Sequence, residues 1–163
     1  IKIDYPKTSA YITPSMKEID ELVEIGCEVI AFDCTRNSRK DGQSAIEFIK
    51  EIKLKYPNQL LMADISNFEE AKNAIDNGID FVGTTLSGYV KGDLPQDGPN
   101  YELVRKIHEY NKDFPIIAEG RINTPEQALK MLEIGAFCIV VGSAITRPKK
   151  KKKKFVDKIK GVQ

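Results

Sequence analysis

The 163-residue sequence has no tryptophan, a single histidine and only three cysteines. Cys27, Cys34 and Cys138 are odd in number and form no C-x-x-C pair, so the sequence indicates neither a disulfide framework nor a zinc site. Isolated cysteines among apolar residues are typical of reduced core residues in a cytosolic protein. We therefore expect a cytoplasmic protein that has no metal site.

The sequence also lacks long hydrophobic runs and an excess of charge of one sign. Its apolar runs are far shorter than the roughly 20 residues of a membrane-spanning helix, and no signal peptide is recognisable after Ile1. Charged residues make up 30% of the chain and the net charge is +1, so no overall field would attract nucleic acid or a membrane. We expect neither among its partners.

A run of lysines from Lys149 to Lys154 is the local exception to this balance. Such a run can bind nucleic acid or another anionic polymer. It is also typical of a solvated helix face or a linker, and a sequence artefact is a further explanation. Because charge is balanced elsewhere, we favour a solvated helical tail that begins after Pro148.

Short apolar runs alternate with amphipathic helical patterns along the whole chain. Three times a helix start leads through an amphipathic segment to a glycine, and a hydrophobic strand follows; these glycines are Gly26, Gly78 and Gly135. Apolar runs bounded by turn residues, with helices between them, predict parallel strands covered by helices. Repeated units of this kind build an α/β fold of the (β/α)8 TIM-barrel type.

We expect six strands, near residues 1–4, 28–33, 59–64, 80–84, 115–119 and 137–142. A closed barrel needs eight strands and typically about 250 residues. Residues 1–163 are therefore expected to form a single barrel domain containing strands 3 to 8, with the first two β/α units absent from this sequence. An open six-stranded sheet is the alternative.

Three carboxylates stand at the ends of predicted strands: Asp33, Asp64 and Glu119. Within residues 29–33 and 60–64 the acid shares one face of the strand with alternating apolar residues. In a barrel that face is the interior, so the acids would surround its mouth. Any one of them could instead be a turn or cap residue, but three acids on different strands favour a functional site.

Other residues near strand ends are weaker candidates. Lys2 shares a strand face with Asp4, and burial at a barrel mouth would lower its pKa and make it a candidate base, although exposed lysines are usually only solvated. The hydroxyl groups of Thr84 and Tyr89 could contact a polyhydroxy substrate, or could reflect strand propensity and loop polarity alone.

The last two predicted strands are each followed by glycine, at Gly120 and at Gly142-Ser143. Barrels commonly bind phosphate in this region through backbone N–H groups and the start of a short helix. Arg147 adds the positive charge that such a site would use. Glycines after strands are also ordinary turn residues, so the pairing of the two segments is what favours a phosphate site.

Seven segments, taken together and in order, resemble the N-acetylmannosamine-6-phosphate 2-epimerase family. They span almost the whole chain: I-K-I-D-Y, A-Y-I-T-P-S, E-V-I-A-F-D, M-A-D-I-S, G-T-T-L-S-G-Y, I-A-E-G-R-I-N-T-P and V-V-G-S-A-I-T-R-P. The resemblance implies a ribulose-phosphate-binding type of barrel from bacterial sialic acid catabolism. It implies interconversion of N-acetylmannosamine 6-phosphate and N-acetylglucosamine 6-phosphate without a metal or redox cofactor. Because an incomplete barrel exposes sheet edges that can pair with another chain, we also expect a homodimer.

The resemblance also implies roles for individual residues. Lys2 and Glu119 match the family's catalytic lysine and glutamate. Asp64 matches a substrate-binding acid, and the substrate-binding group is expected to include Asp33, Thr84 and Tyr89. The residues that fall in the phosphate-binding region are Gly120, Arg121, Gly142, Ser143 and Arg147.

The sequence departs from the family in three places. The family's first two β/α units, with a Gln and an Arg that contact substrate, have no counterpart here. The lysine run replaces a more mixed helix, and Cys34 stands where a small residue such as Ala is expected. Two alternatives therefore stay open: another phosphosugar-binding barrel isomerase or synthase, and a non-catalytic fragment with a polybasic binding segment.

Overall fold

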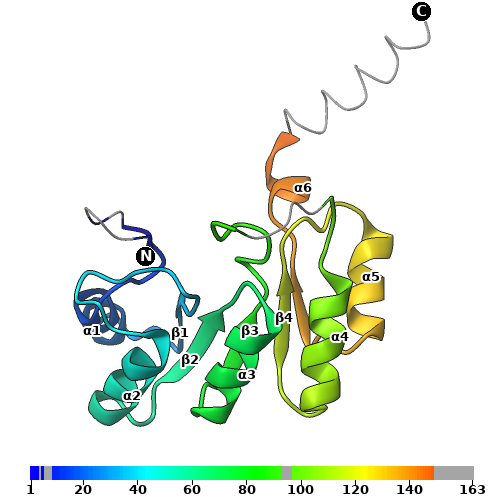
Figure 1. Cartoon of the computed structure of the whole chain (residues 1–163). Coiled ribbons are helices and arrows are strands. Elements are labelled where there is room, and N and C mark those ends of the chain that lie inside the picture. The colour runs from blue at the N-terminus through cyan, green and yellow to red at the C-terminus, as the bar shows by residue number, and fades with distance from the viewer. Residues whose placement is uncertain (4, 6–8, 93–96, 149–163) are drawn as a thin grey trace, which may run out of the picture.

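A computed structural model describes residues 1–3, 5, 9–92 and 97–148 (Figure 1). Asp4 and the Lys149 to Lys154 run, with the helical tail expected there, lie outside the described residues. The described strands form one sheet in the order β1-β2-β3-β4-β5, and every neighbouring pair is parallel. The strands are β1 (Val29–Asp33), β2 (Leu60–Asp64), β3 (Phe81–Gly83), β4 (Ile116–Glu119) and β5 (Cys138–Val140).

Helices alternate with these strands, as the sequence predicts. They are α1 (Met16–Glu24), α2 (Ala45–Lys55), α3 (Phe68–Asp76), α4 (Tyr101–Tyr110), α5 (Pro125–Glu133) and the short α6 (Ser143–Thr146). No helix among the described residues is both long and apolar enough to cross a membrane.

Side-chain caps explain where the helices begin. At the start of α1 the backbone N–H and the hydroxyl group of Ser15 both donate to Glu18, at 2.9 and 2.5 Å. Ser44 and Glu47 form the same capping box at the start of α2. Such reciprocal bonds satisfy N–H groups that have no partner within the helix. These capping residues explain why α1 and α2 begin at Met16 and Ala45.

All five long helices cover the same face of the sheet. Buried residues from α1 to α5 and the strand residues that alternate toward them form a single apolar cluster, and Figure 1 shows the helices arranged along one side. The strand residues in this cluster are Ile30, Phe32, Leu61, Ala63, Val82, Ile116 and Ala118. The opposite face carries the alternate strand positions, among them the half-buried Ala31, Met62 and Ile117.

This arrangement is that of a singly wound sheet. A doubly wound sheet changes direction at a switch point and carries helices on both faces. Here each described strand lies next to its neighbours in the chain, and the five long helices lie on one side of the sheet, as connections of a single hand would place them. The parallel α/β fold predicted from the sequence is confirmed.

The strand expected at residues 1–4 is the exception, and five described strands replace the six expected. Lys2 makes only an isolated antiparallel bridge with Ile12. The N–H of Ile3 donates to Tyr11 O, and the N–H of Thr13 donates to Ile1 O. The backbone groups of residues 1–3 are therefore used in a short hairpin-like contact with residues 11–13, which periodicity does not reveal.

Candidate active site at the carboxyl ends of the strands

Two of the three predicted carboxylates lie side by side. Asp33 and Asp64 are register partners at the ends of β1 and β2, and their side chains are almost fully buried, with exposures of 0% and 3%. Glu119 ends β4 and is half-buried. The sheet thus gathers three acids at its carboxyl edge, because parallel strands all end on the same side.

Burial raises the pKa of Asp64 from 3.8 to about 7. A hydrogen bond from Thr85, 2.8 Å from Oδ1, opposes this change by stabilising the carboxylate. The negative charges of Glu119 and Asp33 also contribute to the raised pKa of Asp64, whereas the positive charge of Lys2 lowers it. Asp33, Glu119 and Lys2 are therefore each close enough to Asp64 to influence its carboxylate electrostatically.

The carboxylate of Asp33 is bonded within its own loop. Its Oδ1 accepts hydrogen bonds from the N–H and the hydroxyl group of Thr35, at 3.0 and 2.7 Å, and its Oδ2 accepts one from Asn37 at 2.9 Å. This is the turn-capping use of an aspartate. The structure thus gives Asp33 an organising part in the loop after β1.

Lys2 is exposed, and its Nζ lies 5.6 Å from the centre of the Tyr11 ring. Its backbone is held by residues 11–13, and Ile12 O in turn accepts a hydrogen bond from Asp33 N–H at the end of β1. Thr13 is buried at a φ of +43°, and its hydroxyl group donates to Ala31 O at 2.7 Å.

A positive φ at a buried β-branched residue is a strained conformation that surrounding structure must enforce. The part that Thr13 plays in holding the Lys2 segment was not predicted from the sequence. Nothing in the sequence signals the strain, because threonine is not a residue type that favours this conformation.

The backbone of Glu119 is fixed by Thr84 on the neighbouring strand end. The Thr84 hydroxyl group accepts a hydrogen bond from Glu119 N–H at 3.0 Å and donates one to Glu119 O at 2.8 Å. Thr84 is 2% exposed. The hydroxyl group of Thr84, predicted to contact substrate, therefore positions Glu119 instead. Both of its hydrogen bonds are made to the backbone of Glu119.

The predicted phosphate-binding residues largely come together. A small pocket of about 150 Å³ lies between the ends of β4 and β5, and its lining residues are Glu119, Gly120, Arg121, Ile122, Val140, Gly142 and Ser143. Arg147 is exposed just after α6 and is not among these residues. The guanidinium group of Arg121 donates hydrogen bonds to two backbone carbonyl groups in the loop after β3.

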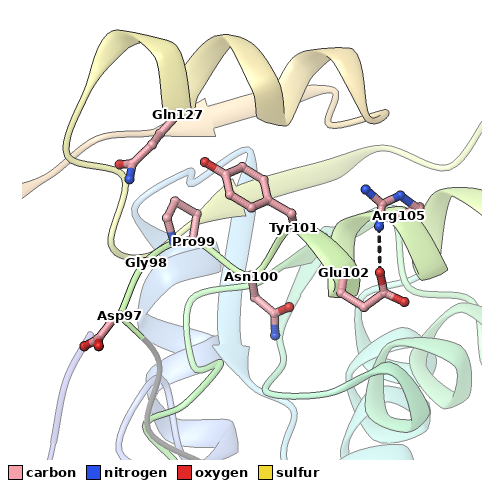
Figure 2. Close-up of a pocket in the computed structure, with 8 residues that line it drawn as sticks. All are labelled: Asp97, Gly98, Pro99, Asn100, Tyr101, Glu102, Arg105 and Gln127. Atoms are coloured by element: carbon pink, nitrogen blue, oxygen red, sulfur yellow. Dashed lines mark hydrogen bonds and ion pairs between the residues drawn. The ribbon is translucent and has the colours of Figure 1, made fainter.

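A larger hollow of about 540 Å³ contains none of the predicted site residues. Figure 2 shows it between the segment that leads into α4 and the first turn of α5. Glu102 and Arg105 form an ion pair at its border, 2.6 Å apart. Within the described part of the chain, no group of three or more His, Cys, Asp or Glu residues is placed to hold a metal ion.

Comparison with known proteins identifies the family of this chain. The family model described as "Putative N-acetylmannosamine-6-phosphate epimerase" matches residues 1–161. The chain belongs to this family. An epimerase-family relative from Caldanaerobacter subterraneus is 47% identical over 98% of this chain and 67% of its own length. One from Borreliella afzelii is 46% identical over the whole of this chain and 71% of its own length. Both are named "Putative N-acetylmannosamine-6-phosphate 2-epimerase".

Similarity to a solved structure supports the assignment of this chain to the same epimerase family. The N-acetylmannosamine-6-phosphate 2-epimerase from Clostridium perfringens superposes with a TM-score of 0.85 at 43% sequence identity. The superposition covers 96% of this chain and 67% of the other. The relatives are thus longer than this chain by roughly half its length, while the matched part retains the family's arrangement.

Proposed function

We propose that the protein catalyses epimerisation at C2 of N-acetylmannosamine 6-phosphate to N-acetylglucosamine 6-phosphate, in amino-sugar and sialic acid catabolism. The observation that carries the proposal is that Asp64 and Glu119 end strands at the same edge of the sheet, where Asp64 is influenced by the charges of both Glu119 and Lys2. Family membership supports the choice of substrate, because both relatives and the superposed structure are named for this sugar phosphate.

The residues suit the chemistry that C2 inversion requires. The ring opens to expose the aldehyde, a base takes the proton from C2, and an acid returns a proton to the opposite face. Two acid/base groups on different elements can serve the two faces. We assign exchange of the C2 proton to Lys2, and ring opening or the opposite-face transfer to Glu119.

Asp64 is proposed to bind the substrate rather than to exchange the C2 proton. With a pKa of about 7 it is partly protonated near neutral pH, so it can donate a hydrogen bond to a sugar oxygen as well as accept one. Its burial beside Thr85 fixes the direction of that bond.

The phosphate is proposed to lie at the pocket between β4 and β5. Gly120, Gly142 and Ser143 line this pocket, so their backbone N–H groups are available for phosphate oxygens. Arg147 would add charge from the residue after α6. The small volume suits a phosphate group rather than the whole sugar.

We propose that further β/α units complete a closed TIM barrel around this sheet. The support is the singly wound order of the strands and the superposition on a longer family member. The open edge of β5, where Cys138 and Val140 are exposed, is the place where another strand would pair. We also propose that the protein is a homodimer. We propose a cytoplasmic location because all three cysteines are free thiols.

Proton exchange measured in D₂O tests the reaction directly. The protein is incubated with N-acetylmannosamine 6-phosphate, and C2 is followed by proton NMR. Incorporation of deuterium at C2 together with appearance of the gluco epimer is the expected result. Binding of phosphorylated sugars without exchange at C2 would instead favour a different phosphosugar isomerase or synthase.

Two variants connect this result to the site. Lys2→Ala and Glu119→Gln should each abolish exchange while leaving the circular dichroism spectrum unchanged. Lys17→Ala is a matched control, because Lys17 is an exposed lysine on α1 whose contact is an ion pair with Glu21. Near-normal turnover in either site variant would remove that residue from the mechanism.

A further inference from the structure

The segment Leu86–Val90, which we call the strap, leaves β3 and contacts elements on both sides of the candidate site. Leu86 and Val90 pack with Ile12 in a small apolar cluster that is separate from the main core, and Tyr11 packs against it. Ile12 is the bridge partner of Lys2. One side of the strap therefore contacts the segment that carries the proposed catalytic lysine.

The other side of the strap is held by Arg121, two residues after Glu119. The Arg121 guanidinium group donates hydrogen bonds to Ser87 O at 2.7 Å and to Gly88 O at 3.2 Å. The same group lies 4.2 Å from the centre of the Tyr89 ring. Arginine can stack its planar group on a ring while it donates two hydrogen bonds in fixed directions. Lysine cannot make this combination of contacts.

The backbone at both ends of this contact is specialised for it. Arg121 has a φ of +55°, and Thr13 is the only other non-glycine residue with a positive φ in the described part of the chain. Gly88 has a φ of +72°, and a Cβ atom there would lie 3.1 Å from Nη2 of Arg121. The positive φ and the close approach together favour glycine at position 88, and the hydrogen bonds that Arg121 makes offset the strain of its own positive φ.

Two further contacts hold the strap and the residue after it. The Asn100 side chain donates to the Ser87 hydroxyl group at 2.9 Å, and Arg36 from the loop after β1 donates to Lys91 O at 3.0 Å. The strap is therefore anchored to the loops after β1 and β4 and to the segment before α4. It physically links the Lys2 and Glu119 sides of the site.

We propose that Arg121 is a positioning residue that clamps the strap and sets Tyr89 at the mouth of the site, and that its side chain is not the ligand of the substrate phosphate. The role of this clamp in catalysis rests on the proposed epimerase function. The experiments that test the clamp itself do not require that function. The guanidinium group of Arg121 is already directed to two strap carbonyls and to the Tyr89 ring, whereas the pocket between β4 and β5 is also lined by Gly120, Gly142 and Ser143.

Amide hydrogen exchange of the intact protein tests the clamp. The N–H groups of Ser87 and Tyr89 bond to Thr84 O and Leu86 O, so they report on the strap. In Arg121→Ala and Arg121→Lys, exchange at these amides should rise at least tenfold, while amides of β1 and β2 stay unchanged. Unchanged exchange at the strap in both variants would overturn the proposal.

Titration with inorganic phosphate separates the clamp from a ligand. If Arg121 only positions the strap, Arg121→Ala should change the dissociation constant for phosphate less than threefold. A loss of tenfold or more would show that the guanidinium group binds the anion, and the proposal would be wrong. Neither this result nor the exchange result depends on epimerase activity, so their failure is distinct from failure of the proposed reaction.

Gly88→Ala provides an independent probe from the other side of the contact. The added methyl group should displace the guanidinium group and increase strap exchange as Arg121→Ala does. In the double variant the two effects should add only in part, because both disturb the same contact while the backbone strain of alanine at a φ of +72° is separate from it. Fully additive effects would mean that Arg121 and Gly88 act separately. For turnover, Arg121→Lys should lower kcat more than it changes phosphate affinity.

Discussion

The hydroxyl group of Thr85 donates a hydrogen bond to the buried carboxylate of Asp64, at 2.8 Å from Oδ1. The same oxygen faces Gly83, where a Cβ atom would lie only 2.8 Å from it. The carboxylate of Asp64 is therefore packed tightly against the end of β3 and against Thr85 in the loop that follows it. Its ionisation is governed by burial, which disfavours the charged form, and by this one hydroxyl group, which favours it.

Replacing Thr85 should change the pKa of Asp64 in a defined direction. Thr85→Val keeps the shape but removes the donor, so the pKa should rise above its value of about 7. Carbon-13 NMR titration of the Asp64 carboxyl group measures this directly. Thr85→Ser retains the hydroxyl group and should leave the pKa close to that of the unchanged protein. A pKa that falls in Thr85→Val would contradict the assignment of the bond.

The raised pKa of Asp64 also predicts how folding stability depends on pH. Between about pH 4 and pH 7 the folded protein keeps a proton on Asp64 that the unfolded chain releases. The free energy of unfolding contributed by this group should therefore decrease as pH rises through that window, by on the order of 4 kcal/mol at most. Urea unfolding at a series of pH values measures it.

Asp64→Asn is the control for this pH dependence. The amide does not titrate, so the decrease between pH 4 and pH 7 should be largely lost, leaving only the slope from other groups. Asp20→Asn provides a comparison, because the pKa of Asp20 is lowered by its bond from Lys55 rather than raised. If Asp64→Asn and the unchanged protein have the same slope, Asp64 does not hold the proton.

Removal of the Thr84 hydroxyl group should uncouple Glu119 from β3. Thr84→Val leaves the N–H and C=O groups of Glu119 without the hydroxyl partner that both use. Loss of such bonds at a buried site costs about 1–3 kcal/mol, and we expect turnover to fall with the displacement of Glu119. Chemical denaturation and the D₂O assay measure the two effects, and Thr84→Ser should restore most of both.

Much of this architecture could be predicted from local sequence. The five strands lie within the expected ranges, and capping residues such as Ser44 and Thr124 start helices where the pattern indicates. These features depend on neighbours within a few residues. The acids at strand ends were also placed correctly, since alternation along a strand decides which face a side chain occupies.

The features that sequence reasoning missed depend on contacts between distant segments. Residues 1–3 pair with residues 11–13 instead of forming the expected parallel strand. The strain at Thr13 and the bonds from Arg121 to the strap join parts of the chain that no local pattern connects. Asp33 behaves as the turn-capping alternative describes, with its carboxylate bonded to Thr35 and Asn37.

Gly135 should tolerate no side chain. Its φ is +108°, and a Cβ atom would lie 2.3 Å from Cγ of His108 on α4. Strain and overpacking together predict that Gly135→Ala lowers the free energy of unfolding by about 3 kcal/mol, measured by urea denaturation. Gly98→Ala is the control, because nothing lies within 4 Å of that Cβ position and φ is not positive.

A second substitution separates the two causes at Gly135. His108→Ala in the Gly135→Ala background removes the ring that the new methyl group meets, so it should recover the steric part of the loss and leave the backbone part. An undiminished loss in the double variant would show that the backbone conformation alone forbids a side chain at this position.

The order of the strands has a consequence for how the chain acquires its structure. In the part of the chain that the structure describes, every strand of the sheet pairs with the strand next to it in the chain, so none of these strand pairings joins remote segments. The sheet can then form by sequential addition of β/α units, in which each new strand pairs with the exposed edge of the strand before it. Registers formed early stay unaltered by what is added later. A portion of such a protein can thus carry the same geometry as its longer relatives, as the superposition with the clostridial enzyme illustrates.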